Sequence, residues 1–328
     1  MAALYDVAAI GNAIVDVLAS ADEAFLGAER LDKGSMRLIG EARAHELYGR
    51  MAPGVEASGG SAANTVAGVA SLGGRSVYVG KVARDALGEV FTHDIRAIGA
   101  RFDTPALSEG PATGRCLINV TADGERTMCT FLGAAVRLTA VDVHPETIAG
   151  AEILYLEGYL FDPEEARAAF AKAAATARAA GRVIALSLSD AFVVERHRAA
   201  LLDFIDADVD VLFANEAEVG ALFESDFETG LAALRGRVKI AAVTRGAQGS
   251  VVLANGASVA VAAEPVARVV DTTGAGDQYA AGFLVGLAAG RPLADCGRLG
   301  ALAAAEVISH FGPRPITRLA DLAAAKGL

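Results

Sequence analysis

The second half of the chain alternates short apolar runs with longer amphipathic segments, and this alternation restricts the fold more than any other feature. Apolar runs typical of buried strands occupy 153–156, 183–187 and 209–213. Segments with helical spacing, at 163–180 and 193–205, lie between them. Strands that alternate with helices form a parallel sheet with helices on both faces. The sequence therefore predicts an α/β fold with a mostly parallel central sheet.

Two apolar runs open the chain, over 4–10 and 13–18, and both predict strands. Gly11 and Asn12 separate them. The second run contains Asp16, and an acid inside an apolar run is costly to bury without a partner. This residue therefore either makes a turn at the end of the strand or has a functional role.

Patterns in the following segments are weaker. Alternation over 31–39 predicts a short hairpin, and 41–51 is typical of a helix. Further along, 113–121 and 126–132 flank Asp123-Gly124, a pair that indicates a hairpin with a type I′ turn.

The most specific motif is DTTGAGD at 271–277, where a loop passes directly into a helix. The apolar pair 269–270 predicts the end of a strand before it. Gly274 and Gly276 expose N–H groups at the helix N-terminus, where the helix dipole favours an anion. Asp277 lies in the first turn, so an ionised carboxylate stands beside this anion site. It is well placed to take a proton from an alcohol that attacks a phosphate, although a core helix with a capping Asp is the plain alternative.

A second glycine motif, Gly59-Gly60-Ser61-Ala62-Ala63-Asn64, precedes a helix of small residues. The glycine pair permits close backbone approach to a ligand, and Asn64 offers both a donor and an acceptor. Together the two motifs resemble the signatures of the ribokinase-like (PfkB) family of carbohydrate and nucleoside kinases. The spacing Asn12-x-x-x-Asp16 resembles the bacterial adenosine kinase-like members of that family.

The resemblance implies a ribokinase-like three-layer sandwich that spans 1–328 as a single domain. A small β-rich lid is expected to come from about 12–57 and 112–132. The implied reaction is transfer of a phosphoryl group from ATP to an alcohol, with Asp277 as general base. The implied anion hole consists of the amides of Gly274, Ala275 and Gly276.

The resemblance also implies roles for particular residues. The expected contacts of the acceptor substrate are Asn12, Asp16, Met36, Gly59, Gly60, Asn64, Arg126, Met128 and Leu160. The expected contacts of the nucleotide are Asn215, Thr244, Gly246, Gly249, Thr273, Ala303 and Ala304. Glu218 is expected to act on Mg²⁺, partly through water, because this hard cation prefers oxygen ligands and keeps several waters. Backbone oxygens of Asp271 and Thr273 leave open a site for a monovalent cation such as K⁺.

Two of these assignments have alternatives in the residues themselves. Asn215 followed by acidic residues is also typical of a capped helix start. Met128 also fits ordinary strand alternation.

Adenosine, phosphorylated on its 5′-hydroxyl to AMP, is the predicted substrate. Met36, Leu38, Met128 and Leu160 are apolar, and such residues suit a flat base. They would equally suit a core, so a sugar kinase for ribose, fructose or a related ketose is the alternative. A non-catalytic ligand-binding relative is a third possibility, against which the intact Gly274–Asp277 segment argues.

Composition excludes other classes. A net charge of −11 argues against a nucleic-acid partner, which requires a basic footprint. Three cysteines without paired spacing indicate free thiols in a reducing cytoplasm. The uncharged stretch 279–290 is too short to span a bilayer. We therefore expect a cytoplasmic monomer or homodimer whose partner is a small nucleoside or sugar, with no membrane contact.

Overall fold

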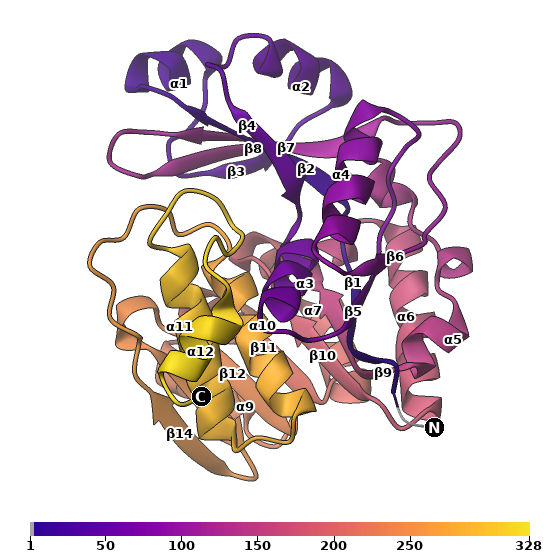
Figure 1. The fold of residues 1–328 in the computed structure, drawn as a ribbon, viewed down its shortest axis with the longest axis vertical. Coiled ribbons are helices and arrows are strands. Elements are labelled where there is room, and N and C mark those ends of the chain that lie inside the picture. The colour runs from indigo at the N-terminus through magenta and orange to yellow at the C-terminus, as the bar shows by residue number, and fades with distance from the viewer. Residues whose placement is uncertain (1–2) are drawn as a thin grey trace.

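The computed structural model describes residues 3–328, which form a large α/β body and a smaller sheet above it (Figure 1). Within these residues the larger sheet has nine strands in the order β14-β13-β12-β11-β10-β9-β1-β5-β6. They are β1 (Tyr5–Ile10), β5 (Ser76–Val79), β6 (Arg101–Phe102), β9 (Ala151–Glu157), β10 (Val183–Ser187), β11 (Val211–Asn215), β12 (Ile240–Thr244), β13 (Ser250–Ala254) and β14 (Ala257–Val261). Neighbours from β12 to β6 are parallel, and β13 and β14 add an antiparallel edge. The predicted mostly parallel sheet is confirmed.

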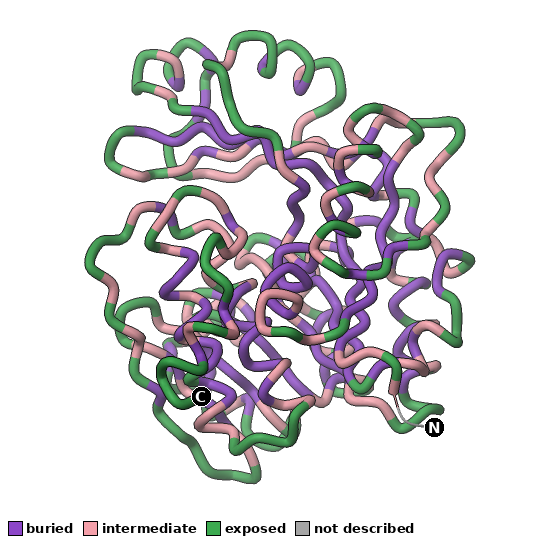
Figure 2. The backbone as a smooth tube through the Cα atoms, viewed as in Figure 1, coloured by how far each residue is buried: buried purple, intermediate pink, exposed green. Residues whose placement is uncertain are grey.

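Helices cover both faces of this sheet because successive strand residues point to opposite sides. In β1, Val7 and Ala9 belong to one apolar cluster, whereas Ala8 and Ile10 belong to the other. The first cluster includes side chains of α3 (Ser61–Ser71), α4 (Ala86–Ala97), α10 (Ala275–Ala288) and α11 (Leu293–Val307). The second includes α5 (Pro145–Ala149), α6 (Glu164–Ala179), α7 (Ala191–Asp208), α8 (Glu216–Phe223) and α9 (Phe227–Leu234). A last helix, α12 (Leu319–Ala325), packs on α11. Figure 2 shows the buried backbone concentrated in the central strands and the inner sides of these layers.

The smaller sheet forms the lid and, within the described residues, has five strands in the order β3-β8-β7-β2-β4. They are β2 (Ile14–Ser20), β3 (Met36–Leu38), β4 (Val55–Gly59), β7 (Thr113–Val120) and β8 (Arg126–Gly133). Helices α1 (Glu23–Glu29) and α2 (Glu41–Tyr48) lie above one face, where Val17, Leu26 and Leu47 pack together. The other face, which carries Ile14, looks toward the large sheet.

Three local predictions differ from the structure, and one helix was not predicted. Val269 and Val270 form no strand, because the large sheet already ends at β14 and the chain crosses from there to α10 as a loop. The segment 31–39 forms no hairpin, since β3 pairs in parallel with the distant β8. The turn after β7 is not type I′, which needs positive φ at two residues, and here only Gly124 (φ 84°) has it. Helix α1 was not predicted.

The structure bears on two predictions drawn from composition. The three cysteines, Cys116, Cys129 and Cys296, are buried and unpaired within the described chain, as predicted. Among the helices of residues 3–328, none has the length and apolar character needed to cross a membrane.

Candidate active site

A cavity of about 460 Å³ lies between the lid and the ends of the central strands. It falls within the size range of ligand pockets, about 300–1,000 Å³. Its floor is made by the carboxyl ends of β9 to β12 and the N-terminus of α10, and its roof by the inner face of the lid. Ligands of open parallel sheets bind at this end of the strands.

The N-terminus of α10 is shaped by a glycine. Gly274 has a φ of 75°, and a Cβ there would lie 2.5 Å from the carbonyl oxygen of Pro313, so no other residue fits without movement. The N–H groups of the first helical turn have no acceptor inside the helix. Gly276, which lies in that turn, lines the cavity. The Ala275 N–H donates to the Thr272 carbonyl oxygen at 3.3 Å. An anion in the cavity therefore meets the amides of this first turn and the positive end of the helix dipole.

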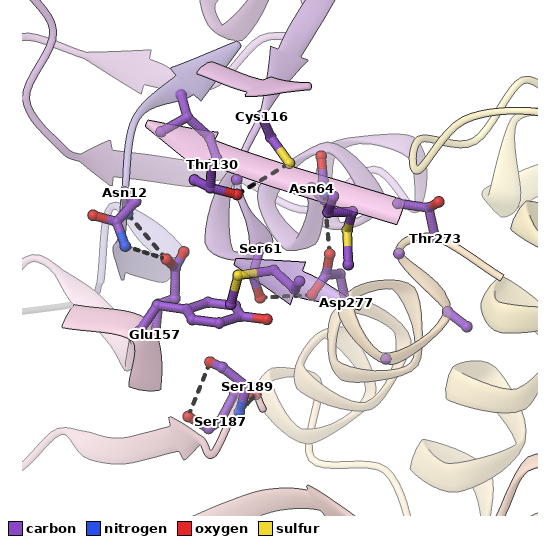
Figure 3. A pocket seen from close by; sticks show the side chains of 18 of the residues that line it. Asn12, Ser61, Asn64, Cys116, Thr130, Glu157, Ser187, Ser189, Thr273 and Asp277 are labelled. Atoms are coloured by element: carbon purple, nitrogen blue, oxygen red, sulfur yellow. Dashed lines mark hydrogen bonds between the residues drawn. The ribbon is translucent and has the colours of Figure 1, made fainter. Parts of the chain in front are cut away.

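Asp277 lies in the same turn and is held by the start of α3 (Figure 3). Ser61 Oγ donates to its Oδ1 at 2.6 Å, and Asn64 Nδ2 donates to its Oδ2 at 3.1 Å. Burial raises the pKa of Asp277 to about 6, while these two bonds and the positive charge of Arg126 oppose the rise. The carboxylate is therefore fixed in position and is ionised near neutral pH.

Asp16 enters the cavity from strand β2 of the lid, where only 4% of its surface is exposed. The paired strand contributes Gly59, and a Cβ at that position would lie 2.1 Å from the Asp16 carboxyl carbon. Burial raises the pKa of Asp16 to about 7, and the guanidinium of Arg314 opposes this most strongly. Glycine in β4 thus makes room for a carboxylate that faces the ligand space.

Arg314 and Asn64 link this region to Asp277. Arg314 Nε donates to Asn64 Oδ1 at 3.4 Å, and its Nη1 donates to Ser58 Oγ. With its oxygen toward the guanidinium, Asn64 turns its NH₂ group toward Asp277. The sequence predicted Asn64 as a substrate contact. In the structure the oxygen and the nitrogen of its side-chain amide both already have protein partners.

Arg126 joins the lid to the loop before α10. Its guanidinium donates to the hydroxyls of Thr272, at 2.9 Å, and Thr273, and its Nε lies 3.1 Å from Asp271 Oδ1. Asp271 also accepts from the backbone N–H groups of Thr273 and Gly312. The cation beside the fully buried Asp271 carboxylate is thus Arg126 of the lid. Through these contacts Arg126 holds the lid against the DTTGAGD loop.

Asn215 and Glu218 form a reciprocal cap at the start of α8. Asn215 Oδ1 accepts from the Glu218 N–H at 2.8 Å, and Glu218 accepts from the backbone and side-chain nitrogens of Asn215. The sequence did not decide whether Asn215 caps a helix, and the structure shows that it does. The same pair, Asn215 and Glu218, lines the cavity. Burial raises the pKa of Glu218 to about 7.

The cavity collects most of the residues predicted to contact ligands. Its lining includes Asn12, Asp16, Met36, Gly60, Asn64, Arg126, Met128, Asn215, Glu218, Thr244, Thr273, Gly274, Ala275, Gly276 and Asp277.

Six predicted residues lie outside this lining. Leu160 is fully buried in the core between β9 and α6, because the chain turns inward after β9 as a 3₁₀ helix. Gly246 and Gly249 shape the turn between β12 and β13. Gly59 lies behind Asp16, while Ala303 and Ala304 belong to α11.

Several cavity residues were not predicted. The most informative are Glu157, at the end of β9, and Ser61, together with the apolar Ile14, Ile118 and Leu132 of the lid. An acid that ends a buried strand was a usable signal for Glu157, by the same argument as for Asp16. Arg314, inside Gly312-Pro313-Arg314-Pro315, carried no local signal.

Comparisons with known proteins agree with this geometry. A model of the pfkB family of carbohydrate kinases matches residues 34–318. The structure of adenosine kinase from Sinorhizobium meliloti is 52% identical, with a TM-score of 0.95 over 98% of this chain and 99% of that one. A probable sugar kinase from Rhizobium etli is 47% identical, with a TM-score of 0.96 over 99% of both chains. Adenosine kinase of Saccharomyces cerevisiae is 28% identical over 78% of this chain and 79% of its own length.

The fold and site thus define a phosphotransferase that acts on an alcohol group of a small molecule. The chain belongs to the pfkB family of carbohydrate kinases, whose members use ATP and Mg²⁺. Its two sheets, one large and mostly parallel and one forming a lid, are those of a ribokinase-like fold.

Proposed function

We propose that this kinase phosphorylates the 5′-hydroxyl of adenosine with ATP, giving AMP and ADP. The observation that carries the proposal is the division of the lid face of the cavity between a group of apolar side chains and the buried carboxylate of Asp16. The apolar part of the roof consists of Ile14, Met36, Leu38, Ile118, Met128 and Leu132, while Asp16, Arg126 and Thr130 are polar members of the same lid face. A nucleoside has the matching division, with a flat, largely apolar base joined to a hydroxylated ring.

In the proposed reaction Asp277 takes the proton from the 5′-hydroxyl as it attacks the γ-phosphate of ATP. The amides of Gly274, Ala275 and Gly276 stabilise the charge that develops on the transferred group, the main protein contribution to phosphoryl transfer. Asp16 accepts hydrogen bonds from the ribose hydroxyls. Arg126 brings its positive charge to the same side of the cavity as the helix N-terminus.

The ATP side is assigned to the ends of β11 and β12, with Asn215 and Thr244 nearest the cavity. We assign four further residues to ATP, although they lie outside the cavity lining. They are Gly246 and Gly249, in the turn after β12, and Ala303 and Ala304, in α11. No group of three or more potential metal-binding side chains exists in the described chain, so an ion held by protein side chains alone is not indicated. Glu218, a single carboxylate, fits Mg²⁺, which binds through phosphates, waters and few protein ligands and neutralises phosphate charge.

The pH profile of kcat/KM is expected to fall on the acid side between about pH 7 and about pH 6. A general base acts only when deprotonated, and burial raises the pKa of Asp277 to about 6 and that of Asp16 to about 7. Protonation of either group therefore lowers activity as the pH drops through this window. The measurement is an initial-rate series from about pH 5 to about pH 8. Activity that stays level down to about pH 5 would contradict the assignment.

Asp16→Ala is expected to raise the KM for adenosine roughly 30-fold, the loss associated with hydrogen bonds to a charged group. The KM for ATP should stay within about threefold, because the carboxylate faces the acceptor side of the cavity. Steady-state kinetics with each substrate varied in turn measure both values. An equal rise of the two constants would place Asp16 in a general structural role.

The experiment that tests the function is a screen for ADP formation by the purified kinase with nucleosides and with free sugars. Adenosine should be the best acceptor, and in that case the activity belongs to purine salvage in the cytoplasm. The second candidate is a sugar kinase, favoured by the 47% identity to the protein described as a probable sugar kinase. A preference for ribose or fructose would select it, and ATP turnover with no acceptor at all would reject both.

A further inference from the structure

We propose that Arg314 is a positioning residue for the candidate base: it fixes the side-chain amide of Asn64 so that the amide nitrogen is held on Asp277. The inference rests on the proposed function in taking Asp277 as the group that accepts the proton of the attacking hydroxyl. Arg314 itself lies outside the cavity lining, so it acts through Asn64 and not on a ligand.

Arg314 belongs to the loop between α11 and α12, and this loop is fixed on both sides of the arginine. Before it, the carbonyl oxygen of Pro313 accepts from Gln278 Nε2 at 3.0 Å. After it, Glu306 Oε1 accepts from the N–H groups of 316 and 317 at 3.0 and 2.7 Å. Gln278 directly follows the candidate base in the sequence. The backbone that carries the arginine is therefore held close to that base.

The guanidinium of Arg314 bridges the lid and helix α3. Its Nη1 donates to Ser58 Oγ, and its Nε donates to Asn64 Oδ1 at 3.4 Å. Ser58 is fully buried near the end of lid strand β4, where its own N–H donates to Asp94 of α4 at 3.1 Å. Because the donors of a guanidinium have a rigid planar arrangement, two anchors on different elements fix its direction.

The chemistry of the two neighbours decides how the Asn64 amide is oriented. A guanidinium only donates hydrogen bonds, so it must face the amide oxygen, whereas an ionised carboxylate only accepts and must face the amide nitrogen. Asn64 meets both conditions, with Oδ1 toward Arg314 and Nδ2 donating to Asp277 Oδ2 at 3.1 Å (Figure 3). A flipped amide would place donors together at Arg314 and acceptors together at Asp277. The arginine thus selects the orientation in which Asn64 holds the base.

Arg314 also keeps this orientation constant when the base itself changes. Asp277 gains a proton in the proposed reaction, and a carboxylic acid can donate a hydrogen bond as well as accept one. An arginine stays charged throughout, because a guanidinium does not lose its proton in proteins. Arg314 therefore keeps the Asn64 nitrogen directed at Asp277 in both protonation states of the acid.

A purely structural role for Arg314 would leave its bond to the Asn64 side chain unexplained. Helix α3 is already joined to α10 by Gln278, whose Nε2 donates to the Asn64 carbonyl oxygen at 2.9 Å. The same Gln278 nitrogen holds the loop at Pro313. Neither connection needs the arginine side chain. What the guanidinium adds is a fixed direction for the amide that contacts the base.

Loss of the guanidinium should change the protonation of the site in one direction. Burial raises the pKa of Asp16 to about 7, and Arg314 opposes this rise more than any other charge. The bond from Asn64 likewise opposes the raised pKa of Asp277. Removal of Arg314 weakens both effects, so it favours the protonated acids. The charged groups and carboxylic acids that share the cavity with Asp277 are Asp16, Arg126, Glu157, Asp162 and Glu218.

Arg314→Met removes the guanidinium and keeps an unbranched side chain in its space. We expect kcat to fall about tenfold, the loss that accompanies one hydrogen bond to a charged group, with the KM for ATP within about twofold. The acid limb of kcat should move to higher pH by about 0.5 to 1 unit, because a base with a raised pKa loses activity sooner as the pH falls. An acid limb that does not move overturns the proposal.

The decisive measurement is a double-mutant cycle on kcat between Arg314→Met and Asn64→Ala. If Arg314 acts through Asn64, its removal should have little further effect once the Asn64 amide is absent. The double variant should then keep kcat within about twofold of Asn64→Ala alone. A further loss of about tenfold in the double variant would show independent effects and would reject the role.

Arg182→Met is the matched control. Arg182 is also a partly buried arginine, which donates to the Ala149 carbonyl oxygen and to Glu152, but it lies outside the cavity lining. The substitution should leave kcat and its acid limb at their wild-type values. A shift of the acid limb in this control equal to that in Arg314→Met would reject the specific role of Arg314.

A second variant covers the case in which Arg314→Met does not fold. Ser58→Ala releases the guanidinium from its lid anchor and leaves the arginine in place. It should lower kcat about threefold, and it should have no further effect when combined with Asn64→Ala. An unchanged kcat in Ser58→Ala would reject the proposal in that case.

Failure of the proposed function is separable from failure of this inference. If the wild type phosphorylates a free sugar and no nucleoside, adenosine is rejected, and the same cycle is measured with that sugar, because Arg314 acts on the base and not on the acceptor. If Asp277→Asn keeps its turnover, Asp277 is not the base and the inference is rejected with that assignment. If Asp277 is the base and the two effects are independent, only the role of Arg314 is rejected.

Discussion

Asp277→Asn is expected to lower kcat about 10²- to 10⁴-fold, the range that accompanies loss of a general base. An asparagine has the shape of the carboxylate but cannot accept the proton of the attacking hydroxyl. It can keep both present contacts, with its oxygen toward Asn64 Nδ2 and its NH₂ group toward Ser61, whose hydroxyl rotates to accept. The fold and the binding of both substrates should therefore change little.

Single-turnover and steady-state rates with saturating ATP and acceptor measure this effect, and a thermal unfolding curve shows whether the fold is intact. Asp295→Asn is the matched control, because Asp295 lies in the first turn of α11 and outside the cavity lining. It should retain wild-type turnover. If Asp277→Asn keeps turnover within about threefold of the wild type, Asp277 is not the base.

The parts of the fold that sequence alone predicted are those coded by local periodicity. The strands β9, β10 and β11 and the helices between them follow from apolar spacing within short segments. The turn at Gly274 follows from glycines whose conformations other residues rarely adopt. For the same reason the sequence located the helix N-terminus, and the cavity indeed surrounds it.

The parts that sequence did not predict depend on contacts between distant segments. Strand β3 has too few residues to carry a pattern, and it exists as a strand only because β8 pairs with it. Leu160 and Met128 are equally apolar, and only the direction of the backbone sends one into the core and the other into the cavity. Arg314 reaches Asn64 across 250 positions of the sequence. No local signal marks such partners.

Adenosine is expected to be phosphorylated with a kcat/KM at least about 100-fold above that for ribose or fructose. A factor of about 100 corresponds to about 2.7 kcal/mol. Burial of about 110 Å² of apolar surface supplies that amount at about 25 cal/mol per Å². A base lying against the apolar roof buries surface of this order, whereas a free sugar leaves Met36, Ile118 and Met128 without an apolar partner.

A substitution in the lid tests whether the apolar roof of the cavity causes the preference for adenosine. Met128 lies on β8, lines the cavity and is partly exposed, so Met128→Gln keeps the length of the side chain while placing an amide against the base. We expect kcat/KM for adenosine to fall about tenfold and that for ribose to stay within about twofold. Met51→Gln is the control, because Met51 packs on the opposite side of the lid, beside α1 and α2. Equal or better activity of the wild type on a free sugar would reject adenosine as the substrate. It would leave the fold and the role assigned to Asp277 unchanged, because the roof residues determine which acceptor binds and take no part in the transfer of the phosphoryl group.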